Sequence, residues 1–169
     1  SVAWGVITSK VTSTKQSAAW TAPSAIIESI LAIQTERAAL GTGLNLSTVV
    51  LSGAQYAKVM GVLLDKGVLP REDANPVLSG TMPVNAFGLD WVTSPHVTGT
   101  DPWLIDREQL GGVGDERLGS PGYTTASGTT IEVQSIRHKD DKYELRARRV
   151  CVPVVVEPLA GVKITGTGL

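Results

Sequence analysis

The sequence predicts an α+β fold in which two amphipathic helices flank a central mixed sheet, with long loops between the elements. Two segments have the apolar spacing of helices, and several short runs are β-branched or alternate between polar and apolar residues. The chain has 18 glycines and 9 prolines but only 5% aromatic residues, a composition typical of short elements joined by turns. Its 169 residues fit one domain with a sizeable core.

The clearest predicted helix covers residues 21–40. Thr21 can cap its start, Pro23 suits the first turn, and Gly41 provides a stop after the last turn. The apolar residues between them follow helical spacing, namely Ile26, Ile30, Ile33 and Leu40.

A buried strand and a second helix are predicted next. Residues 46–51 are apolar on both faces, as in a strand inside a sheet. Ser52 and Gln55 have the spacing of a capping box, in which each side chain bonds to the other residue's backbone N–H. The residues expected on the buried face of this helix are Tyr56, Val59, Met60, Leu63 and Leu64.

Further strands are predicted at residues 88–94, 103–105 and 161–165, and residues 131–137 and 143–152 are expected to form a hairpin. Two long loops, 68–83 and 107–128, separate these elements. The first 20 residues alternate weakly and favour an extended conformation.

Charge, hydropathy and cysteine content limit the classes of function that the chain can have. The chain has 15 basic and 16 acidic residues, so any DNA contact should be weak and non-specific. No segment is apolar for long enough to span a membrane. Its one cysteine, Cys151, excludes an internal disulfide and is expected to behave as a small buried apolar residue.

Motifs that could support catalysis or cofactor binding are weak. The glycines at 111, 112 and 114 lack the sequence of a phosphate-binding loop and favour a flexible turn. His96 and His138 share no metal-ligand spacing. Three acidic residues could gather near a strand end, although solvated loop charge is the favoured interpretation: Asp101, Asp106 and Glu108. We therefore expect no enzyme activity, metal or cofactor.

A basic cluster lies in the predicted hairpin. Strand alternation places Arg146 and Arg148 on the face opposite Leu145 and Ala147. This face is either solvated or forms salt bridges between subunits, with contact to packaged DNA as a weaker alternative.

The order of these elements resembles the axial domain of tailed-bacteriophage major capsid proteins, a fold shared with encapsulins. The resemblance rests on the apolar helix 25–40, the strand that enters a capped helix at 48–57, the segment 88–95, and a closing pattern of charged and apolar strands at 145–164. It implies an axial-domain core at 21–130, and a C-terminal hairpin and strands at 131–169 that return to the peripheral region.

The resemblance also implies a function. Such a chain is expected to be a structural subunit of the icosahedral capsid of a tailed phage or prophage. It would assemble in the bacterial host cytoplasm into pentamers and hexamers that enclose the DNA genome. The expected partners are copies of itself, with a scaffold or maturation protease and a portal as further candidates. Residues 5–7 resemble the segment after the family's spine helix, so the N-terminal arm, extended loop and spine helix are expected to have no counterpart in this sequence.

Two alternatives remain. One is an encapsulin-like compartment shell that encloses protein cargo, and the other is a stand-alone ligand-binding α+β domain. For a shell subunit, we expect the contacts between neighbours to come from loop charges and the two hairpin arginines. These residues are Arg71, Glu72, Asp73, Arg107, Glu108, Asp115, Glu116, Arg117, Arg146 and Arg148.

Overall fold

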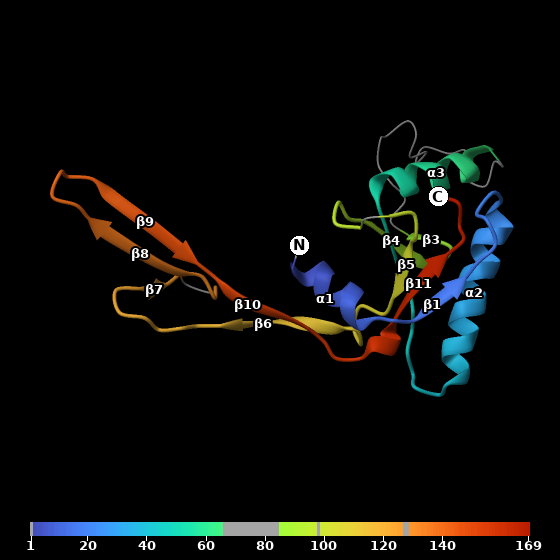
Figure 1. Cartoon of the computed structure of the whole chain (residues 1–169), viewed down its shortest axis with the longest axis horizontal. Coiled ribbons are helices and arrows are strands. Elements are labelled where there is room, and N and C mark those ends of the chain that lie inside the picture. Colours follow the sequence, from blue (N-terminus) through green and yellow to red (C-terminus); the bar gives the residue numbers. More distant parts are fainter. Residues whose placement is uncertain (1, 66–84, 98, 127–128) are drawn as a thin grey trace. The chain divides into compact units, whose positions relative to one another are not determined.

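The computed structural model describes residues 2–65, 85–97, 99–126 and 129–169, which form two compact units (Figure 1). Unit 1 comprises Ser1–Gly111 and Val155–Leu169, and unit 2 comprises Gly112–Val154. The predicted loop 68–83, with Arg71, Glu72 and Asp73, lies outside the described residues.

Unit 1 is built around a mixed sheet of six strands in the order β1-β11-β5-β2-β4-β3. Strand β2 runs parallel to β4 and antiparallel to β5, and β11 runs parallel to β1 and antiparallel to β5. The predicted strands near 46–51, 88–94, 103–105 and 161–165 are thus confirmed. The strand bounds are β1 Thr14–Gln16, β2 Thr48–Leu51, β3 Asn85–Ala86, β4 Leu89–Thr93, β5 Trp103–Ile105 and β11 Gly161–Thr165.

Helices α2 (Pro23–Ala39) and α3 (Gly53–Asp65) contribute to one hydrophobic cluster on a face of this sheet. The central strand β2 is buried along its whole length, and Val49 and Leu51 belong to this cluster. The helices contribute Ile26, Ile30, Ile33, Tyr56, Val59 and Leu63, while Met60 packs against them. The predicted core is therefore confirmed except at Leu64, which is 40% exposed.

The predicted helix ends are partly correct. Pro23 occupies the first turn of α2, and Gly41 follows the helix with a φ of 65°, a conformation that glycine adopts without strain. The N-cap is Ala22, which makes no side-chain cap hydrogen bond, so the prediction that Thr21 caps the helix is wrong.

The capping box is confirmed at the start of α3. The Gln55 backbone N–H donates to Ser52 Oγ at 3.3 Å, and the Ser52 N–H donates to Gln55 Oε1 at 2.7 Å. These reciprocal bonds satisfy backbone groups at the helix start and fix the turn between β2 and α3.

The other face of the sheet carries a second cluster, which includes Val50 and Trp103. Helix α1 (Val2–Lys10) contributes Trp4 and Ile7, and the Trp4 ring meets Trp103 edge-on with 5.5 Å between centroids. The extended conformation expected for the first residues is therefore wrong between Val2 and Lys10. Contact with this face stabilises a helix that local sequence does not specify.

Unit 2 contains a sheet of three strands in the order β7-β8-β9. Strands β8 (Glu132–Arg137) and β9 (Tyr143–Arg148) form the predicted antiparallel hairpin, and β7 (Thr124–Thr125) pairs antiparallel with β8. Asp141 lies in the hairpin turn with a φ of 56°.

Strands β6 (Gly111–Glu116) and β10 (Val150–Val155) pair with each other in a separate two-stranded sheet. The loop predicted at 107–128 and the flexible turn predicted at its glycines are therefore partly wrong, because this segment pairs as a strand. The predicted strand 143–152 is divided at Arg149, because the residues before it pair with β8 and the residues after it pair with β6. Cys151 is exposed on β10, which corrects the expectation that its side chain is buried.

Candidate interaction surfaces

The hairpin in unit 2 has two different faces. Residues directly opposite each other in the β8–β9 register share a face, because side chains alternate along each strand. The network face carries Glu132 opposite Arg148, Gln134 opposite Arg146, and Ile136 opposite Glu144. The apolar face carries Val133 opposite Ala147, Ser135 opposite Leu145, and Arg137 opposite Tyr143.

Glu132 is the centre of the network face, with 4% of its surface exposed. Its carboxylate accepts the Gly119 backbone N–H at 2.8 Å and the Arg148 Nε–H at 2.7 Å. The Arg148 guanidinium lies 4.0 Å from the centroid of the Tyr123 ring, a cation–π contact. Arg148 thus joins the hairpin to the segment around residues 119–123.

Charged partners also surround Glu144 and Asp115. Glu144 accepts the Arg146 Nε–H at 2.6 Å and lies 3.1 Å from His138 Nε2. Asp115 binds Arg149 through two hydrogen bonds of 2.9 and 2.8 Å. The hydrogen bond from Arg149 lowers the pKa of Asp115, and the one from Arg146 lowers the pKa of Glu144.

The hydrogen bonds that Glu132 accepts from Gly119 and Arg148 predict that the attachment of this segment weakens in acid. The hydrogen bond from Gly119, followed by the one from Arg148, lowers the pKa of Glu132 below 4.5. The ionised carboxylate therefore stabilises the fold above the unfolded-state pKa, and this contribution disappears as the pH falls through the lowered folded-state value. We expect protection of the Gly119 amide from hydrogen exchange to fall with acid below about pH 4.5, measured by NMR after correction for intrinsic rates.

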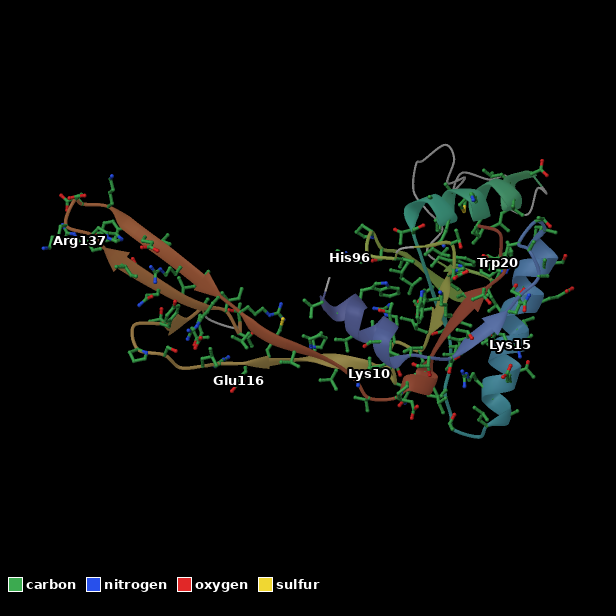
Figure 2. The ribbon with its side chains drawn as sticks, in the orientation of Figure 1. Lys10, Lys15, Trp20, His96, Glu116 and Arg137 are labelled. Carbon is green, nitrogen blue, oxygen red and sulfur yellow. The ribbon has the colours of Figure 1, made fainter. Side chains whose placement is uncertain are left out.

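The matched variants are Glu132→Gln and Glu116→Gln. Glu132→Gln should weaken the protection of Gly119 at neutral pH and remove most of its acid dependence. Glu116 is exposed at the end of β6 (Figure 2), so Glu116→Gln should keep the parent profile. Identical profiles in both variants would show that Glu132 does not hold this segment.

In unit 1, a polar cleft lies beside the end of β5. Asp106 is buried there and accepts backbone N–H groups of Asn45, Glu108 and Gln109 at 2.8, 3.0 and 3.2 Å. Its carboxylate therefore shapes a turn, and the interpretation of Asp106 as solvated loop charge is wrong. Asp101 instead pairs with Lys163 at 2.9 Å and is not among the residues that line this cleft, whereas Asp106 and Glu108 both line it.

The structure separates the described residues of the predicted interface into two groups. Arg107 and Glu108 are exposed in unit 1, and Arg107 lies 3.9 Å from Asp90. The other five belong to unit 2, where Arg117 Nη2 donates to the Thr129 carbonyl at 3.2 Å. Four of these five have an ion-pair or hydrogen-bond partner in their own unit, namely Asp115, Arg117, Arg146 and Arg148. Their contact with neighbouring subunits stays a prediction.

Sequence reasoning missed the apolar face of the hairpin. Leu145 is 73% exposed and Tyr143 is 64% exposed, while the network face is partly covered by its own unit. The alternation of Tyr143, Leu145 and Ala147 against Glu144, Arg146 and Arg148 was visible in the sequence. The sequence leaves open whether the charged face is solvated or forms salt bridges between subunits, whereas the structure shows that the apolar face is the more exposed of the two.

Two further searches cover only the described part of the chain. There, no group of three or more His, Cys, Asp or Glu side chains is placed to hold a metal ion. No helix among the same residues is long and apolar enough to cross a membrane.

Comparison with known proteins identifies one family. A family model described as phage capsid protein matches residues 1–164. No curated protein matches the sequence.

Two solved structures share the fold. A chain from Mycobacterium phage Che8 has a TM-score of 0.59 and 16% identity, and the match covers 99% of this chain and 57% of that one. The crystal structure of a phage-related protein from Bordetella bronchiseptica has a TM-score of 0.54 and 15% identity, with 95% and 59% covered. This chain therefore spans less than two thirds of the length of either structure, and the predicted α+β fold is confirmed.

Proposed function

Because this chain belongs to the phage capsid protein family, we propose that it is a structural subunit of the icosahedral capsid of a tailed phage or prophage. Copies of it assemble into pentamers and hexamers that enclose the DNA genome. The observation that carries this proposal is the family match over residues 1–164. The likeness of its fold to two phage-related structures supports the same function.

Subunits in a closed ring need two different complementary patches, because a rotational contact joins unlike surfaces. The described chain offers candidate patches in each unit: exposed charge at Arg107 and Glu108 in unit 1, and charged and apolar strand surfaces in unit 2. This supply of exposed contact groups supports a role in self-association. The match to a phage family favours a shell around DNA over a compartment that encloses protein cargo.

The proposal extends to partners and location. The subunit would act without enzyme activity or a cofactor, assemble in the host cytoplasm and reside in the virion capsid. Copies of itself are the main partner, and a scaffold or maturation protease and a portal are the further ones. Because the net charge is −1, contact with packaged DNA would be weak and non-specific.

The test is to purify nuclease-treated particles from the phage or prophage that encodes the chain. We expect its peptides to be among the most abundant in the mass spectrum of DNA-filled particles. Gold-labelled antibody against the chain should decorate the shell. Absence of these peptides from particles would contradict the proposal. Labelling confined to tails would do the same, and labelled shells that contain protein cargo without DNA would support the compartment alternative.

A further inference from the structure

Strand β9 forms one edge of the three-stranded sheet in unit 2 (Figure 1). Within the described residues, its only strand partner is β8. Edge strands are commonly protected from pairing with other chains by charged side chains, proline or a bulge. The sequence of β9, Tyr-Glu-Leu-Arg-Ala-Arg, has no proline, and its register with β8 is regular. Its three charged side chains are of both signs, so they can pair with charges of a suitably aligned strand. Among the described residues of unit 2, this edge is therefore open to another strand.

The register identifies the backbone groups at that edge. The His138 N–H donates to the Lys142 carbonyl at 2.8 Å, which makes these two residues a hydrogen-bonded pair. Hydrogen-bonded pairs alternate with non-hydrogen-bonded pairs in an antiparallel ladder. Glu144 and Arg146 therefore direct their backbone groups toward β8. Tyr143, Leu145 and Ala147 direct theirs outward, where they can receive a further strand.

The side chains of β9 complement a second copy of β9 best in one antiparallel register. Residues that direct their backbone groups outward must lie opposite one another, and two such registers pair five of the six β9 residues, one centred on Leu145 and one centred on Arg146. Centring on Arg146 places Glu144 opposite Arg148 of the partner subunit, but it opposes two arginines at the centre. Centring on Leu145 opposes no like charges among the paired β9 residues, because Glu144 lies opposite Arg146 of the partner subunit and Arg146 opposite Glu144 of the partner subunit. Lys142, which precedes the strand, then lies opposite Arg148 of the partner subunit. Opposite charges stabilise directly opposed strand positions, whereas like charges destabilise them.

The same register satisfies the backbone and the apolar side chains. It places Leu145 opposite Leu145 of the partner subunit, and Tyr143 opposite Ala147 of the partner subunit. All of these residues direct their backbone groups outward, so they can exchange hydrogen bonds across the contact. The exposed side chains of Leu145 and Tyr143 then gain apolar neighbours on the same face.

We infer that two copies of this chain pair through the free edges of their β9 strands, antiparallel and with Leu145 of each copy opposite Leu145 of the other. The contact is two-fold symmetric, because the same surface is used by both copies. It joins the two sheets into one continuous sheet. The inference rests on the proposed function, since a shell supplies the second copy, and it adds a specific contact that a family match does not provide.

The first test is a charge exchange measured on the purified chain by sedimentation equilibrium. Glu144→Arg and Arg146→Glu each place like charges opposite one another, so each should weaken self-association on the order of tenfold. The double variant restores opposite charges and should associate like the parent. An equimolar mixture of the two single variants should form mixed dimers, although each associates poorly alone.

Three results of the charge-exchange experiment would overturn the proposed pairing of β9 strands. A parent chain that stays monomeric at the highest concentration at which it is soluble would overturn the inference. Single variants that associate like the parent would overturn it too, as would a double variant as weak as the singles. Glu144 is half-buried and Arg146 is exposed, and each single variant also loses the ion pair between them within one chain. Circular dichroism checks that every variant keeps the fold of the parent, so that a change in association can be attributed to the contact.

Cysteine crosslinking tests the register separately, in a Cys151→Ser background that removes the exposed native thiol. Directly opposite residues of a hydrogen-bonded pair have Cα atoms about 5.5 Å apart, within the range of a disulfide. Leu145→Cys should therefore form disulfide-linked dimers on mild oxidation. Tyr143→Cys should do so only when mixed with Ala147→Cys. Equal crosslinking of Tyr143→Cys and Leu145→Cys, each alone, would overturn this register.

These measurements also separate the inference from the proposed function. Both use the purified chain, so they report on β9 pairing whether or not a shell forms. If the chain is abundant in phage particles but the exchange and crosslinking results fail, only the β9 contact is overturned. If β9 pairs in solution but the chain is absent from particles, the capsid function is overturned while the contact remains.

Discussion

Replacing Leu63 by alanine is expected to lower the free energy of unfolding of unit 1 by about 2 to 5 kcal/mol. Leu63 is 2% exposed and packs in the cluster that joins α2 and α3 to the sheet. The loss includes the transfer of its side chain to water and the cavity that remains. Domains are stable by only about 5 to 15 kcal/mol, so this change removes a large part of the total.

The chain supplies a matched control in the next residue. Leu64 is in the same helix but 40% exposed, so Leu64→Ala makes the same chemical change with less loss of buried contact. We expect it to cost less than about 1 kcal/mol. Urea unfolding followed by tryptophan fluorescence measures both, because all four tryptophans belong to unit 1. Equal losses in the two variants would show that the face carrying Leu63 does not form the core.

Local sequence signals predicted the elements whose causes are local. The spacing of Ile26, Ile30 and Ile33 specifies the buried face of α2, and Gly41 marks its end. Ser52 and Gln55 specify the start of α3 through bonds that need only neighbouring residues. Strand alternation and turn residues were likewise sufficient for the β8–β9 hairpin.

Elements that depend on distant contacts were missed. Helix α1 has no buried residue of its own, and its helical form accompanies the contact of Trp4 with Trp103, which is remote in sequence. Strand β6 contains three glycines and would be a poor strand in isolation. Its pairing with β10, some 40 residues later along the chain, makes it extended. Neither contact can be read from a window of neighbouring residues.

The candidate surface was predicted in part for the same reason. The charges of the hairpin were identified, but the sequence did not show that Glu132 would be buried by Gly119 and Arg148. Burial of that polar network leaves Tyr143 and Leu145 on the more exposed face. The two-residue period gave the correct grouping of side chains, and only the tertiary structure shows which group faces solvent.

Reversing the charges of Arg107, Glu116 and Arg117 together is expected to lower the yield of complete shells by about tenfold or more, because many weak contacts between subunits are lost together. This prediction rests on the proposed function. The three residues are exposed, so their contribution to the fold of one subunit is small. Each contact between neighbours is worth about 1 kcal/mol or less, but a shell repeats it at many positions.

The experiment introduces Arg107→Glu, Glu116→Lys and Arg117→Glu into the gene from which particles are produced, and counts particles by electron microscopy. The control introduces Lys10→Glu, Glu28→Lys and Lys58→Glu, which also changes two exposed basic residues and one exposed acidic residue. Circular dichroism and thermal unfolding establish that both subunits fold, which matters because Arg117 loses its bond to Thr129. Folded subunits without shells in the first variant, together with normal shells in the control, support the predicted contact residues. Normal shells at normal yield from both would refute them, because a surface that tolerates complete charge reversal cannot lie in a charge-dependent contact between subunits.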